Sequence, residues 1–138
     1  MSLTLAALTA QDKNTLRTAA YGAVSLMAAA NAAGSPHKAA TRGAIALTSA
    51  TGQVGHVLAA KTRIENLGGT TTAALAERVL PALTAAMDLL NQQSPAEAAN
   101  FRSTVTVAVE AAARAHQGEP GPAPAAMARK ITAALDAA

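Results

Sequence analysis

The stretch SPAEAANFRSTVTVAVEAAARA, residues 94–115, decides the fold. It opens with Ser94 and Glu97, a capping-box pair that satisfies backbone N–H groups at the start of a helix. Pro95 suits the first helical position, because an N–H there would have no partner inside the helix. Beyond this start, apolar residues recur every three or four positions, which is the spacing of one helix face. That face holds Phe101, Val105, Ala108, Ala112 and Ala115.

The middle of this stretch also fits a β-strand. Residues Ser103–Val109 are rich in β-branched side chains and alternate in polarity. However, the capping box precedes them, alanine-rich turns flank them, and Gly118 follows as a helix stop. These flanking signals favour a helix, so we predict that the whole region is helical.

The N-terminal region predicts a first helix. Thr9 and Asp12 resemble a helix-start pair, and the helix is expected to end near Asn31. Polar side chains, among them Arg17 and Tyr21, are expected on the side opposite its apolar stripe. The stripe consists of Leu16, Ala20, Ala23 and Met27.

A second helix is predicted to begin at Ser35 and Pro36, where the serine caps the end and the proline occupies the first turn. Apolar residues keep a helical period from there to Leu58. Glycines inside this segment weaken it by about 1 kcal/mol each relative to alanine. A break near Gly52 therefore remains an alternative to one continuous helix, and Gly68 with the glycine after it ends the region.

A third helix is expected after the threonines at 70–72, which offer N-caps. Leu75, Val79 and Leu83 share its apolar face, whereas Pro81 falls on the other face. A proline inside a helix removes one backbone hydrogen bond and crowds the preceding turn. We predict a kink within one helix rather than two separate elements.

The C-terminal region changes in composition. Residues 118–124 are rich in glycine and proline, which predicts a loop or hinge. Beyond the hinge, Met127, Ile131 and Leu135 recur every four residues and predict a shorter C-terminal helix. Its apolar stripe is narrow, so docking on its own chain and docking on a neighbouring copy both remain open.

The composition favours an all-helical chain with a thin core. Alanine fills 40 of the 138 positions, and only 30 residues are Val, Ile, Leu, Met, Phe or Tyr. Burying a large aliphatic side chain contributes about 1.5–3 kcal/mol, and an alanine methyl much less. We predict an all-α single domain over residues 1–138, a bundle of four main helices plus the shorter C-terminal helix, mainly antiparallel. The thin core leads us to expect a homo-oligomer.

Charge and targeting signals narrow the partners. The formal net charge of +3, with 14% charged residues, is too small for the dense basic patch of a nucleic-acid-binding domain. The first residues, Met1–Ala7, lack the basic segment of a secretory signal. The longest apolar run, Ala19–Ala33, is shorter than a bilayer span. We expect a cytoplasmic protein that binds neither nucleic acid nor a membrane.

Reactive side chains form no pattern that indicates catalysis. The histidines, His37, His56 and His116, make no pair with one another at helical spacing, and cysteine is absent, so no metal site is indicated. The eight acidic residues are spread almost one per helix, whereas acid–base catalysis needs two groups in one pocket. No nucleophile elbow or phosphate-binding loop occurs. We therefore predict a protein that is not an enzyme and has no metal or cofactor.

A basic stripe in the second helix is the main candidate for ligand binding. In a continuous helix, Lys38, Arg42 and His56 fall on one side, together with Ser49 and Gln53. Such a stripe can meet an anion, a small ligand or an acidic partner. The alternative is a solvated helix face whose positive charge has no function.

Tyr21 and Ile45 are the candidates for a subunit interface, because both fall on the outer sides of their helices. The leading hypothesis is a non-catalytic helical interaction or structural module that self-associates and can bind a protein partner. A second hypothesis is a small-ligand or anion-binding protein that uses the basic stripe. A third is an enzyme whose cryptic site is assembled from distant polar residues.

Overall fold

The computed structural model describes four segments of the chain, residues 8–30, 36–59, 71–114 and 122–138. Within them the chain forms six helices and no strand, which confirms the all-α prediction. Residues Ser103–Val109 are helical, so the strand alternative is wrong. The helices are α1 (Ala10–Ala30), α2 (Pro36–Thr48), α3 (Gly52–Ala59), α4 (Thr72–Gln93), α5 (Pro95–Ala113) and α6 (Pro122–Asp136).

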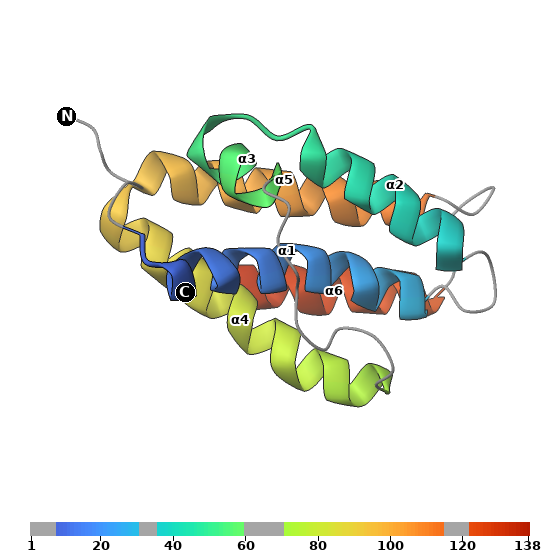
Figure 1. The fold of residues 1–138 in the computed structure, drawn as a ribbon. Coiled ribbons are helices and arrows are strands. Elements are labelled where there is room, and N and C mark those ends of the chain that lie inside the picture. The colour runs from blue at the N-terminus through green and yellow to red at the C-terminus, as the bar shows by residue number, and fades with distance from the viewer. Residues whose placement is uncertain (1–7, 31–35, 60–70, 115–121) are drawn as a thin grey trace.

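Helix α1 lies at the centre of the bundle and packs against the other five helices. Helices α2 and α5 lie side by side in opposite directions along one edge, and α4 lies on the other side of α1 (Figure 1). Neighbours along the chain run mainly antiparallel, as the short connections predict.

Two helix starts form as the sequence predicts. The backbone N–H of Thr9 donates to Asp12 Oδ2 at 3.1 Å, and the N–H of Asp12 donates to Thr9 Oγ1 at 3.0 Å. At the start of α4, Thr71 Oγ1 accepts from the N–H of Ala74 at 3.1 Å. Pro81 lies inside α4, which continues past it as a single helix. The predicted cap Ser35 and the loops near Asn31, Gly68 and Gly118 lie outside the described residues.

The predicted second helix is two helices, α2 and α3, so the break near Gly52 is real. Gly52 has φ +73°, a left-handed conformation in which a side chain would be strained. The hydroxyls of Thr48 and Ser49 both donate to the carbonyl of Ile45, at 2.9 and 3.0 Å. The backbone N–H of Ser49 donates to the same carbonyl at 3.2 Å and also to that of Ala46, so three donors share the Ile45 carbonyl at the last turn of α2.

The C-terminal helix begins earlier than the sequence predicts. It starts at Pro122, so residues 122–124 of the expected hinge form its first turn. Prolines are tolerated there because first-turn N–H groups have no helical partner. Thr84 Oγ1 of α4 donates to the carbonyl of Ala134 at 2.7 Å, and Arg102 of α5 forms a salt bridge with Asp136. Helix α6 therefore docks on its own chain.

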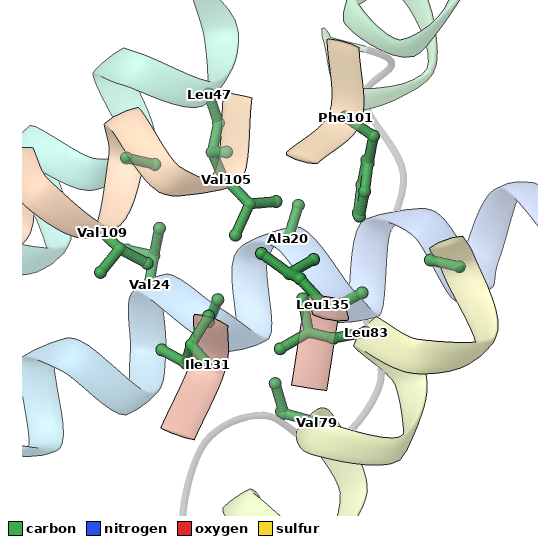
Figure 2. Packing of buried hydrophobic residues seen from close by; sticks show 14 of the residues in the cluster. Ala20, Val24, Leu47, Val79, Leu83, Phe101, Val105, Val109, Ile131 and Leu135 are labelled. Atoms are coloured by element: carbon green, nitrogen blue, oxygen red, sulfur yellow. The ribbon is translucent and has the colours of Figure 1, made fainter. Parts of the chain in front are cut away.

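All six helices contribute to one hydrophobic core. Figure 2 shows labelled core residues from α1, α2, α4, α5 and α6. Phe101, the largest fully buried side chain, points from α5 toward α1. Small residues let the helices approach closely. At Gly22 of α1, an added Cβ would lie 2.4 Å from Val79 Cγ2 of α4, so a larger residue would have to displace this valine.

Candidate interaction surface

Two large hydrophobic side chains remain exposed in the described part of the chain, and both belong to the same pair of helices. Ile45 of α2 is 60% exposed and Val107 of α5 is 53% exposed. A cluster of exposed apolar side chains commonly marks a protein–protein contact, whereas single ones are unremarkable. Ile45 was expected to point outward, but Val107 was not singled out by the sequence.

Two shallow hollows follow the seam between α2 and α5. The first, about 410 Å³, is lined by Arg42, Ile45, Ala46, Ala111 and Arg114. The second, about 190 Å³, is lined by Ala46, Ser49, Ala50, Ser103, Thr104 and Val107. Both hollows are lined by Ala46, so they form one continuous strip of surface. We call the residues that line the two hollows the α2–α5 face.

The α2–α5 face is polar at both ends, but only one end is charged. The exposed side chains of Arg42 and Arg114 lie at one end, and Lys38 lies one turn before Arg42 on α2. Ser49 and Ser103 lie at the other end and carry only hydroxyl groups. No acidic residue lines either hollow. The face thus has an apolar middle, a cationic end and a hydroxyl end.

The structure does not bring the predicted basic stripe together. Lys38 and Arg42 are exposed on α2, whereas His56 is exposed on α3, beyond the break at Gly52. The stripe required one straight helix through all three residues, and the change of direction at Gly52 removes that geometry. Of the three, only Arg42 lines the α2–α5 face.

Tyr21 makes a contact inside its own chain. Its hydroxyl donates to the carbonyl of Leu58 at 2.9 Å, and Nε of Arg17 donates to the carbonyl of Val57 at 3.1 Å. Burial raises the pKa of the Tyr21 hydroxyl above its usual value of 10.0, and the nearby Arg17 charge acts in the opposite direction. Arg17 is only 9% exposed, although the sequence placed it on a polar face. Both side chains hold the C-terminal end of α3.

The N-terminal end of α3 is held from α5. Glu97 Oε1 accepts from the N–H of Val54 at 3.2 Å and from Asn100 Nδ2 at 3.3 Å. Asn100 Nδ2 also donates to the carbonyl of Thr51 at 2.9 Å. A negative group thus lies at the N-terminus of α3, and the positive Arg17 lies at its C-terminus, which complements the helix dipole. These contacts stabilise an eight-residue helix that would be marginal alone.

The capping box at the start of α5 forms only one of its two hydrogen bonds. Ser94 Oγ accepts from the N–H of Glu97 at 3.4 Å. The N–H of Ser94 donates to the carbonyl of Leu90 instead of to Glu97. This leaves the Glu97 carboxylate available for α3, a long-range role that the sequence motif did not reveal.

A third hollow, about 490 Å³, lies between α1 and α4 and has a different character. Its lining includes Gln11, Asn14, Thr15, Thr18 and Arg78, with Pro81 and alanines from α4. No carboxylate or histidine lines it, so it holds no acid–base pair. In the described residues no three metal-ligating side chains gather, and none of the described helices could span a bilayer.

Comparisons of the chain with models of protein families, with curated proteins and with solved structures found no match. The description of the protein therefore depends on its fold and its surface. The described chain is an all-α bundle with one hydrophobic core and an exposed α2–α5 face that combines apolar and cationic side chains.

Proposed function

We propose that the protein is a non-catalytic helical interaction module that self-associates through the α2–α5 face. The observation that carries the proposal is the position of Ile45 and Val107, which are both exposed and both line this face. Every other large hydrophobic side chain in the described residues is at least partly buried. The surface left for a partner is thus one strip rather than scattered positions.

The size of the α2–α5 face fits weak, reversible association. A 13-residue helix is about 20 Å long, and two helices side by side are about 20 Å wide. The face thus measures roughly 400 Å² in projection, or about 800 Å² over two copies, which is smaller than the about 1,200–2,000 Å² of standard specific interfaces. Burying the exposed parts of Ile45 and Val107 contributes a fraction of the about 1.5–3 kcal/mol that full burial of each would give. We expect a weakly associating homo-oligomer that dissociates on dilution.

The two other functions suggested by the sequence gain less support. Anion binding by Lys38, Arg42 and His56 requires them to converge, and they lie on two helices that are separated by the break at Gly52. A cryptic enzyme site requires a pocket that brings two or more reactive groups together. The hollows along α1–α4 and α2–α5 contain no carboxylate or histidine, and the hollow on α6 contains one carboxylate, Asp136, which forms a salt bridge with Arg102. The interaction module is therefore the function that the geometry favours.

Sedimentation velocity over a range of protein concentrations tests the proposal. We expect the wild-type chain to shift from monomer to dimer as the concentration rises, and Ile45→Asp and Val107→Asp to remain monomeric. Ala85→Asp is the matched control, because Ala85 is exposed on α4 and the substitution changes the charge equally. Circular dichroism establishes that all variants are folded. A wild-type monomer at high micromolar concentration, or an equal effect of Ala85→Asp, would contradict the proposal.

A further inference from the structure

Helix α3 depends on side chains from other helices to stay folded. It contains eight residues, whereas α1, α4 and α5 contain 21, 22 and 19. It packs against α1, α2 and α5. Because so short a helix is unstable in water by itself, α3 stays helical only while it is docked on the bundle. Its helical structure and its docking are therefore lost together.

Four polar side chains hold the two ends of α3. On α1, Arg17 and Tyr21 donate to the carbonyls of two consecutive residues in the last turn of α3. On α5, Glu97 accepts from a backbone N–H in its first turn, and Asn100 donates to the carbonyl of Thr51 just before it. We call these four side chains the α3 clamp. All of its contacts reach backbone atoms at the ends of α3, so they break when α3 moves away.

The apolar contacts of α3 are small beside those of the longer helices. Its large buried side chains are Val54, Val57 and Leu58, which are 0%, 3% and 1% exposed. Fixing each residue of a helix costs conformational entropy, and three aliphatic side chains offset this cost only in part for eight residues. The α3 clamp therefore supplies a substantial share of the docking stability. The packing of α1 on α4 and of α2 on α5 does not involve α3.

The connection between α2 and α3 has the properties of a hinge. Gly52 has φ +73°, and an added Cβ at Gly55 would lie 2.2 Å from the carbonyl oxygen of Ala50. Two glycines thus form a turn that other residues cannot adopt without strain. Glycine also reaches more alternative backbone conformations than any other residue. Rotation about Gly52 can therefore move α3 while α2 stays anchored by the buried Leu47.

We propose that α3 is a detachable lid, which opens about Gly52 as one unit while α1, α2, α4, α5 and α6 remain packed. Opening removes Val54, Val57 and Leu58 from the core and exposes the surfaces of α1 and α5 against which α3 packs. The α3 clamp sets how often the lid is open, because every opening breaks its contacts. The lid operates within one chain and does not depend on self-association.

Thiol labelling in increasing urea tests the lid, because the chain has no native cysteine and a buried thiol reacts only after it becomes exposed. Val54→Cys reports on α3 and Val79→Cys on α4, and both positions are 0% exposed. We expect Val54→Cys to react about tenfold faster or more, with a weak dependence on urea, since a lid exposes less surface than unfolding does. Labelling of Val79→Cys should rise steeply with urea.

Variants of the α3 clamp test what controls the opening. We expect Arg17→Met to accelerate labelling of Val54→Cys about 30-fold, the factor for losing a hydrogen bond from a charged group. Glu97→Ala should accelerate it about fivefold, as for the loss of a cap. Arg129→Met, at an exposed position of α6, is the control and should leave the rate unchanged. Circular dichroism establishes that all variants are folded.

Equal labelling rates with equal urea dependence at positions 54 and 79 would overturn the lid, because α3 would then open only when the whole fold unfolds. Faster labelling of Val54→Cys that neither clamp variant changes would overturn the role of the clamp. Hydrogen exchange of α3 and α4 in the wild type, over the same urea series, gives the same comparison without a cysteine. Sedimentation velocity tests self-association separately, so the two proposals can fail independently.

Discussion

Helices α2 and α3 follow each other in the sequence but meet their surroundings in opposite ways. Helix α3 is short, and side chains from α1 and α5 satisfy both of its ends. Helix α2 buries Ala39 and Leu47 but leaves Ile45 exposed beside Arg42. The difference teaches that polar side chains directed inward complete the bundle around α3, whereas α2 leaves apolar and charged side chains exposed to solvent.

Among the contacts that hold α3, we expect the one made by Arg17 to contribute most to the stability of the fold. Arg17→Met keeps most of the buried stem but removes the bond to the carbonyl of Val57 and the positive charge at the end of α3. A buried hydrogen bond from a charged group contributes about 2 kcal/mol. We expect the free energy of unfolding, measured with urea, to fall by about that amount. Arg129→Met, at an exposed position of α6, is the control and should change it by less than about 0.5 kcal/mol.

Replacing Glu97 loosens the other end of α3. Glu97→Ala removes the acceptor for the N–H of Val54, and loss of such a cap costs about 1 kcal/mol. We expect hydrogen exchange to become faster in α3 than in the wild type and to stay unchanged in α4. The free energy of unfolding in urea should fall by about 1 kcal/mol. The matched control is Glu110→Ala, because Glu110 is exposed on the same helix. Equal effects of the two substitutions would show that Glu97 does not hold α3.

Tyr21→Phe is expected to give the smallest loss in the free energy of unfolding and to change how that free energy depends on pH. Removing the hydroxyl deletes the bond to the carbonyl of Leu58, which contributes roughly 0.5–1 kcal/mol. Because burial raises the pKa of Tyr21, its contribution is complete below the unfolded value of 10.0 and is lost as the pH rises through the folded pKa.

Urea unfolding of the wild type and of Tyr21→Phe between neutral and strongly alkaline pH measures this contribution. The wild type should lose stability more steeply than the variant above pH 10, because only the wild type can ionise at position 21. Lysines titrate in both proteins, so the difference between the two curves isolates Tyr21. Parallel curves would contradict a buried Tyr21 hydroxyl.

The sequence predicts local features of this fold well. Thr9, Thr71 and Ser94 begin helices as expected, because a cap depends only on residues within one turn. The outward position of Ile45 also follows from helical spacing alone. The outward position of Val107 could have been predicted in the same way, because Val107 lies outside the apolar stripe that contains Phe101.

Features that depend on distant residues were not predictable. Arg17 is buried where α3 packs on α1, and it donates to the carbonyl of Val57, 40 positions away. Local spacing does not indicate a pairing between residues so far apart in the sequence. The bond from the Tyr21 hydroxyl to the carbonyl of Leu58, 37 positions away, is likewise not indicated by local spacing. The path of the chain after Gly52, which separates His56 from Arg42, depends on a left-handed glycine conformation and on the contact of α3 with Glu97. Composition and periodicity indicate neither the glycine conformation nor the contact with Glu97.

Hydrogen exchange measured by mass spectrometry at low and at high protein concentration tests the central claim, that the α2–α5 face is the self-association surface, most directly. The account predicts slower exchange at high concentration in peptides that cover residues 42–50 and 103–114, with no change around Ala85 of α4. Protection confined to α4 or α6, or exchange that is independent of concentration throughout the chain, would contradict it.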